Sequence, residues 1–211
     1  MQTREPLTWR RRLLRTRWCV SVWALRPLYL VMDGLFIKAC RFRTIDGIPV
    51  GVLEGEKAEA TWPRVESALG VIRRYDPRRL HRLKEDVARI LVVPNRQSVF
   101  SRSSRSIVLH QIYVDKMPPA NLASALVHEA IHARLRRDGF TAYGADLIER
   151  VEELCCDEEI AFAMRCPPDR FPQRDEWLRY LEARRRTYPG TQAWPPSKRR
   201  GVWPPLRDES V

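Results

Sequence analysis

Two histidines and a glutamate interrupt an otherwise apolar segment of this 211-residue chain. Around them the residues from 122 to 131 are mostly Leu, Ala, Val and Ile, and Gly139 follows as a typical helix stop. The pattern predicts one helix from Pro118 to about Asp138. Residues four apart project from the same helix face, so His128 and His132 would lie together, with Glu129 beside them. Burying these three groups without partners would be costly.

This spacing brings two imidazoles within reach of one metal ion. A bound zinc ion lowers the pKa of its water towards 7, and a neighbouring carboxylate can then take the proton. We therefore expect one Zn²⁺ ion held by His128 and His132, with Glu129 as the general base. The alternative is a helix whose two histidines are simply hydrogen-bonded in the core.

A third ligand is expected on a second helix, from about Ala145 to Met164. On a helical wheel, Glu152 lies about 80° from the centre of its apolar face and Glu153 about 180° away. Glu152 is therefore favoured as the ligand, and Glu153 with Asp157 remains the alternative. Glu159 lies on the flank of Glu152 and could orient a ligand without touching the metal. The acidic residues considered were Glu149, Glu152, Glu153, Asp157, Glu158 and Glu159.

The motif His128-Glu129-Ala130-Ile131-His132, followed by Glu152, resembles the gluzincin metallopeptidases, with a thermolysin-like minimal core. The segment from Arg150 to Ala163 is also similar to small uncharacterised bacterial metallopeptidases. The resemblance covers residues 60 to 166. It implies His128, His132 and Glu152 as zinc ligands and Glu129 as base. The Asp expected three or four residues after the ligand glutamate is absent, because positions 155 and 156 are both Cys.

The expected fold class is α+β: a zincin-like minimal domain with a short antiparallel sheet packed on the motif helix and the following glutamate helix. We expect a basic, apolar arm at 1–45, the metallopeptidase domain at 46–187, and a tail rich in Pro and Arg at 188–211. The predicted strands are Ile48–Leu53, Val87–Val93 and Ile107–Val114, with residues 95–105 as a loop. The other predicted helices are Thr61–Tyr75, Arg79–Asp86 and Trp177–Arg186.

The same resemblance implies a peptide or protein substrate that pairs with an edge strand, for which Ile107–Val114 is in the right place. His110 and Tyr113 on this segment could border the cleft, although a surface or core role is the simpler expectation. Tyr143 and Arg150 are candidates for stabilising an oxyanion. Cys155 is expected in the core, and Cys156 could approach the metal.

A net charge of +12 and a pI of about 10.1 favour acidic partners. Six arginines precede an apolar stretch from Trp18 to Ile37, which could dock on the domain or lie on an anionic membrane surface through residues 1–40. Charges and Pro27 interrupt the stretch, so it is too short to span a bilayer. No motif indicates specific nucleic-acid binding. The odd count of five cysteines favours a reducing compartment. We expect a cytoplasmic protein, peripheral at the inner membrane face if the arm binds lipid.

Two functional hypotheses follow. The first is a zinc peptidase that acts through a metal-activated water. The second is a catalytically silent, zinc-stabilised regulatory or interaction domain. The presence of Glu129 favours the first, because a purely structural site needs no base.

Overall fold

The computed structural model describes residues 34–35, 37–53, 55–94, 98–140 and 145–186. They form an α+β domain with a five-stranded mixed sheet. In chain order, the elements are β1 (Arg41–Ile45), β2 (Ile48–Val52), η1 (Gly55–Lys57), α2 (Ala58–Tyr75), α3 (Pro77–Asp86), β3 (Arg89–Val93), β4 (Val99–Ser101), β5 (Ser106–His110), α4 (Gln111–Lys116), α5 (Pro119–Arg137), α6 (Ala145–Arg165), η2 (Pro168–Arg170) and α7 (Arg174–Arg186).

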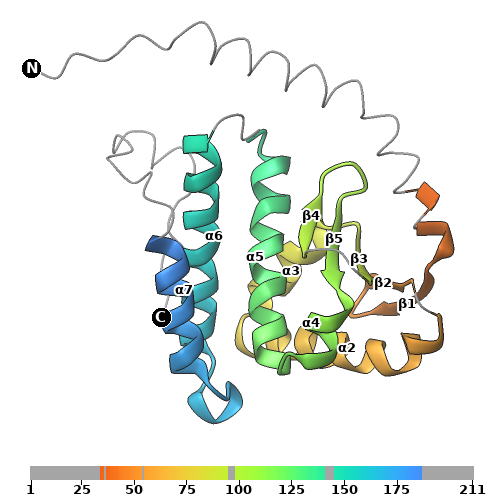
Figure 1. The fold of residues 1–211 in the computed structure, drawn as a ribbon, viewed down its shortest axis with the longest axis horizontal. Coiled ribbons are helices and arrows are strands. Elements are labelled where there is room, and N and C mark those ends of the chain that lie inside the picture. The colour runs from red at the N-terminus through yellow and green to blue at the C-terminus, as the bar shows by residue number, and fades with distance from the viewer. Residues whose placement is uncertain (1–33, 36, 54, 95–97, 141–144, 187–211) are drawn as a thin grey trace, which may run out of the picture.

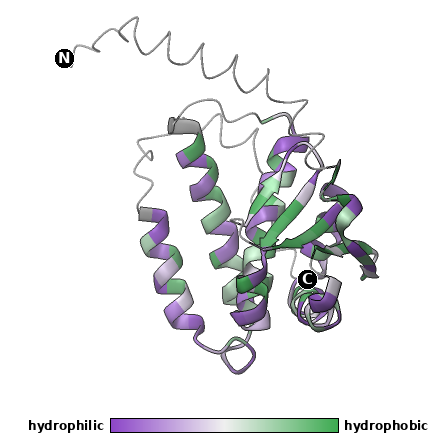
Figure 2. Cartoon of the chain, turned by 45° about the vertical axis from the view of Figure 1, so that its right-hand side comes forward, coloured by the Kyte–Doolittle hydropathy of each residue, from purple (hydrophilic) through white to green (hydrophobic). Residues whose placement is uncertain are grey.

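The strand order of the sheet is β1-β2-β3-β5-β4. The outer pairs β1–β2 and β4–β5 are antiparallel, whereas β2, β3 and β5 run parallel to one another. The prediction of an antiparallel sheet is therefore wrong for the three inner strands. Their nearly continuous apolar sequences are typical of parallel strands buried on both faces, and Figure 2 shows the hydrophobic colouring of the central strands.

A tight hairpin joins β1 to β2 and was not predicted. Asp46 and Gly47 have φ values of 50° and 80°, as a two-residue turn requires, and Asp-Gly is a typical sequence for it. Residues 41–45 were assigned to the N-terminal arm, but they pair along the whole of β2. The sheet thus begins before the expected boundary at residue 46.

The region between β3 and α5 also differs from the prediction. Residues 99–101 were expected in a loop and instead form β4, the edge strand beside β5. The strand expected at Ile107–Val114 ends at His110, where α4 begins. The Nδ1 atom of His110 accepts a hydrogen bond from the Ile112 amide at 3.0 Å and so caps that helix. The buried Gln111 and Val114 are three residues apart, which suits a helix better than a strand.

Helix α2 begins three residues before the predicted Thr61, because Ala58 already belongs to its buried face. Thr61 does not cap the helix. It is buried, and its hydroxyl accepts a hydrogen bond of 3.0 Å from Gln111. Pro63 lies inside the helix rather than in its first turn. Asp76 caps α3 by accepting from the Arg79 amide at 3.2 Å.

Helix α5 is the centre of the fold. It packs against α2 and the sheet on one side and against α6 on the other, and α7 covers the far side of α6 (Figure 1). Its buried residues Leu122, Ala123 and Leu126 join the main hydrophobic core between helices and sheet. This position carries the His-Glu motif to the junction of the sheet, α5 and α6.

Helices α3, α5, α6 and α7 lie where the sequence predicts them, to within three residues at each end. Most of the N-terminal arm and the whole of the tail lie outside the described residues, as does Tyr143. Within the described part of the chain, the helices are all too short or too polar to cross a membrane.

Candidate metal centre

Helix α5 places its three motif residues at one site. His128 and Glu129 are 4% and 8% exposed, and the rings of His128 and His132 lie 5.1 Å apart, centre to centre. The helix begins with Pro119 in its first turn and stops before Gly139, whose φ is +84°. As a result, the motif lies in the second half of a long, mostly buried helix.

Glu152 of α6 meets both histidines. Its Oε1 lies 3.3 Å from Nε2 of His132, and its Oε2 lies 3.5 Å from Nε2 of His128. Partial burial opposes the charged carboxylate, but hydrogen bonds from the two histidines outweigh it and hold the pKa of Glu152 far below its usual range. The favoured candidate from the helical wheel is thus the acidic side chain that reaches the histidine pair.

Glu159 contacts the other ring nitrogen of His128. Its Oε2 lies 3.1 Å from Nδ1 of His128, and its Oε1 accepts a hydrogen bond of 3.0 Å from Ser124. Trp177 of α7 donates to the same Ser124 hydroxyl at 3.0 Å. Burial alone would lower the pKa of His128, but Glu152 and Glu159 raise it to about 9. A metal ion bound at Nε2 would displace the proton there, while the Nδ1 proton would stay in the hydrogen bond to Glu159.

Glu153 and Asp157, the alternative ligands on α6, pair with arginines. Glu153 is buried and pairs with Arg150, and its second oxygen lies 3.9 Å from Arg185. Asp157 also pairs with Arg185, at 2.9 Å. The alternative of Glu153 with Asp157 as ligands therefore has no geometric support, because both pair with arginines, whereas Glu152 contacts both histidines.

Cys155 joins the histidine pair as well. Single ligand atoms of His128, His132 and Cys155 all lie within 4.8 Å of one another, so this buried cluster could hold a metal ion. Burial raises the pKa of the Cys155 thiol well above its usual value, and the side chain packs with Ile131 and Leu135. The prediction that Cys155 lies in the core is confirmed, since it is fully buried, although it also borders the two histidines. Among the described residues, Cys156, which was expected as the cysteine that could approach the metal, is not part of the cluster.

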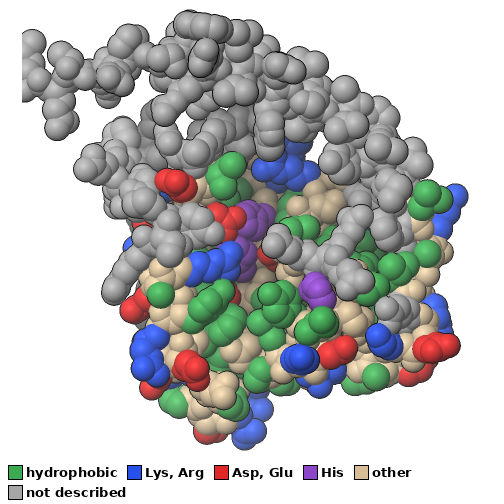
Figure 3. Space-filling model, viewed as in Figure 1, with side chains coloured by type: hydrophobic (Ala, Val, Ile, Leu, Met, Phe, Trp, Pro, Cys, Tyr) green, Lys and Arg blue, Asp and Glu red, His purple; other side chains and the backbone are tan. Residues whose placement is uncertain are grey.

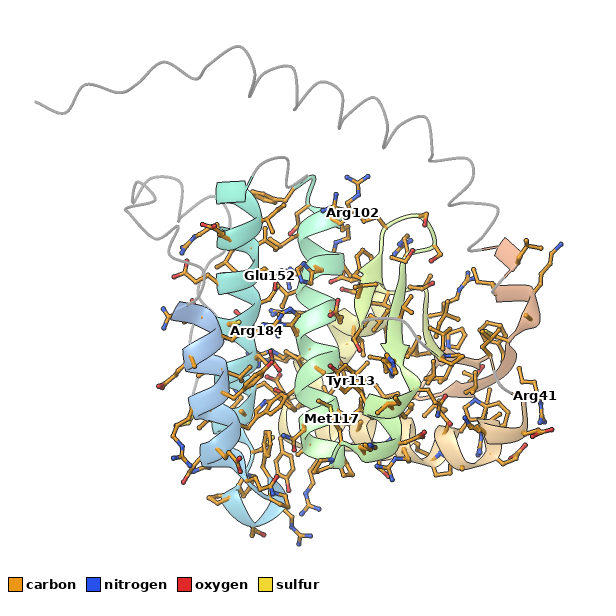
Figure 4. The ribbon with its side chains drawn as sticks, viewed as in Figure 1. Arg41, Arg102, Tyr113, Met117, Glu152 and Arg184 are labelled. Atoms are coloured by element: carbon orange, nitrogen blue, oxygen red, sulfur yellow. The ribbon has the colours of Figure 1, made fainter. Side chains whose placement is uncertain are left out.

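Arg184 of α7 is a site residue that the sequence analysis missed. Its Nη2 lies 3.2 Å from Oε2 of Glu152 and 3.4 Å from Nε2 of His128. Figure 4 shows Arg184 and Glu152 on neighbouring helices. The signal was present in the spacing, because Trp177, the fully buried Leu181 and Arg184 recur at four and three residues and share one helix face.

A pocket of about 240 Å³ opens over these groups. In Figure 3, two adjacent patches of histidine (purple) lie near the centre of this face, with basic side chains (blue) on two sides. The lining of the pocket combines the polar cluster with apolar walls and two further arginines, Arg102 and Arg136. The apolar walls are formed by Val99, Phe100, Leu135, Phe140 and Val151.

The strand beside this pocket is β4, which contributes Val99 and Phe100. The prediction that residues 107–114 form the edge strand is therefore wrong, since β5 is covered by β4. His110 caps α4 and Tyr113 is half exposed, and neither lines the pocket. Arg150 is engaged by Glu153, so it is not available at the cluster.

No protein-family model, no curated protein and no solved structure matches this chain. The donor chemistry of the site is nevertheless informative. Imidazole nitrogens with a carboxylate, or with a thiol, suit zinc and related transition metals, whereas magnesium and calcium prefer sets made of oxygen alone. The residues present therefore fit a zinc ion.

Proposed function

We propose that this chain is a zinc-dependent metallopeptidase with a zincin-like, gluzincin-type site. The observation that carries the proposal is the convergence of three donors from two helices. Nε2 of His128 and Nε2 of His132 both lie within 3.5 Å of the Glu152 carboxylate, at the floor of a pocket. Two imidazoles and one carboxylate, with a fourth position open to water, form the ligand set typical of catalytic zinc.

In this proposal His128, His132 and Glu152 hold the metal, and Glu159 orients His128. When bound, zinc would lower the pKa of its water and polarise the peptide carbonyl. In the metal-free protein the two histidines hold the pKa of Glu152 low, so its carboxylate is already anionic, as a metal ligand must be.

Glu129 supplies the base. It is buried, lines the same pocket, and is influenced electrostatically by both histidines. Its carboxylate takes a proton from water as the water oxygen bonds to the carbonyl carbon. It then returns this proton to the peptide nitrogen as the C–N bond breaks, so the reaction consumes one water molecule and yields a free acid and an amine.

Arg184 is our candidate for stabilising the negative charge that develops on the carbonyl oxygen. Its guanidinium already lies against Glu152 at the pocket floor, and it is held on a helix rather than on a loop. Donors that are fixed before the reaction contribute most to this kind of stabilisation. Of the two residues considered for this role, Arg150 is engaged by Glu153, and Tyr143 lies outside the described residues.

A peptide substrate is supported by β4. Among the described residues, this short strand pairs with β5 alone, so its other edge is available for main-chain hydrogen bonds. Val99 and Phe100 belong to both the strand and the pocket wall. An extended peptide paired with β4 would therefore pass over the metal site.

The substitution Glu129→Gln tests the proposal, because it preserves size and hydrogen bonding but removes the base. Zinc content and melting temperature should stay near those of the unmodified protein. Cleavage of a mixed peptide library, followed by mass spectrometry, should fall by about 10²-fold or more. Equal turnover by the two proteins would refute the assignment of Glu129, and no cleavage by the unmodified, zinc-loaded protein would refute a peptidase.

One observation favours a second candidate function. If Cys155 were a fourth ligand, the site would be closed, as structural zinc sites are, and the protein would be a zinc-stabilised regulatory or interaction domain. The buried, protonated thiol and its apolar neighbours argue for the open site. Metal analysis of a Cys155 variant, described below, separates the two.

A further inference from the structure

Two arginines at the pocket have no role in the proposed chemistry. Arg102 follows β4, and Arg136 lies on α5, one turn or about 6 Å beyond His132. Both line the pocket that contains the histidines, and both side chains are exposed. Figure 4 shows Arg102 near the C-terminal end of α5, which is the end that carries Arg136.

The neighbouring arginines pair with carboxylates, whereas these two have no such partner among residues 34–186 as far as the structure describes them. Arg137 pairs with Asp86, and Arg134 lies 3.8 Å from Asp138. Arg184 contacts Glu152. Within the described residues, the side chains of Arg102 and Arg136 form no ion pair and no hydrogen bond. In the part of the chain that the structure describes, the pocket therefore presents two arginine side chains without an anionic partner.

The surroundings of these cations limit what they can bind. Phe100, Leu135 and Phe140 form apolar walls beside them, and the metal-site cluster lies below. A ligand that fills the pocket would place an anionic group against the arginines and an apolar group against the walls. A carboxylate matches the forked donors of arginine and is the anionic group that peptides carry.

We infer that the pocket selects peptides that carry a carboxylate close to the cleaved bond, bound by Arg102 and Arg136. The inference rests on the proposed function and names the substrate class of that site. The carboxylate can come from an acidic side chain or from the free C-terminus of the peptide. Arg102 and Arg136 determine specificity and take no part in breaking the bond.

Binding to the full-length Glu129→Gln protein tests this inference, because bound peptide would stay uncleaved. Four labelled peptides of one apolar sequence would be compared by fluorescence anisotropy: with Glu or Gln at one internal position, and with a free or amidated C-terminus. A preference for Glu identifies an acidic side chain as the source, and a preference for the free C-terminus identifies the terminal carboxylate. Arg102→Gln and Arg136→Gln should each lower the affinity for the preferred peptide by about 3- to 10-fold. Added salt should reduce the difference in affinity between the variants and the parent protein.

Arg78→Gln is the matched control. Arg78 is exposed on α3 and does not line the pocket, so its loss changes the net charge equally but should leave peptide affinity unchanged. Equal binding of all four peptides, no binding of any, or an equal effect of Arg78→Gln overturns the inference. If single-stranded DNA binds more tightly than any of the peptides, and its affinity depends on Arg102 and Arg136 in the same way, the inference is also overturned in favour of a phosphate ligand. The proposed function fails separately, through absence of turnover by the unmodified protein.

Discussion

The Nδ1 atom of His128 lies 3.1 Å from Oε2 of Glu159, and both side chains are buried. This contact fixes the orientation of the imidazole ring before any metal arrives. Glu159→Gln should therefore weaken zinc binding by about 10- to 100-fold, the usual effect of losing such an outer contact. Competition with a chelator of known affinity measures this loss. An unchanged affinity would show that the ring is held by other contacts.

Glu152 and Glu153 are adjacent in sequence but should respond differently to substitution. Glu152→Gln removes a proposed ligand and should lower zinc affinity more than Glu159→Gln does, with little loss of fold. Glu153→Gln instead removes the buried partner of Arg150, so it should lower the melting temperature and leave zinc content near one ion per chain. Metal analysis and thermal unfolding of both variants provide the comparison. The reverse pattern would make Glu153 the ligand.

Cys155 decides between an open and a closed site. We expect Cys155→Ala to retain zinc and peptide hydrolysis, because His128, His132 and Glu152 suffice as ligands. The smaller side chain leaves a cavity in a buried cluster, so stability should fall by roughly 1 kcal/mol. Loss of stoichiometric zinc in Cys155→Ala, with His128 and His132 intact, would favour the structural site. Cys156→Ala is the matched control on the same helix.

The buried arginine of α3 is expected to matter for stability and not for chemistry. Arg79 is 6% exposed and pairs with Asp76 at 2.6 Å and with Glu158. Arg79→Met would leave these carboxylates without their main partner, at a cost of about 3–5 kcal/mol. For a chain of this size, the melting temperature should fall by about 6–20 °C. Scanning calorimetry measures the change, with Arg78→Gln as the exposed neighbour. A shift equal to that of the control would contradict the expected stabilisation.

The helices of the site could be predicted from the sequence because their apolar residues recur with helical period. The same periodicity favoured Glu152 over Glu153. It also placed Glu159 on the same flank of the helix as Glu152, and both residues contact His128 in the structure. Which acidic residue meets the histidines depends on one helix facing another, and a clear apolar face carries that information.

Other features depend on contacts between distant segments and could not be predicted in this way. The continuous apolar runs of β3 and β5 are compatible with parallel strands, but the sequence does not show which strands are neighbours, and the inner sheet was assigned wrongly. Three residues of β4 are too few to give a pattern. Arg184 lies in a run of three arginines, and only the packing of α7 on α6 distinguishes it from Arg185, which turns to Asp157.

All of the proposed ligands come from α5 and α6, and none comes from the sheet. A bound ion would therefore act as a cross-link between two neighbouring helices whose connection is only a few residues long. Its removal should loosen the helical side of the domain while the β-strands keep their own hydrogen bonds. Hydrogen–deuterium exchange would then report metal occupancy as slow exchange in α5 and α6, whatever the chemistry that the site performs.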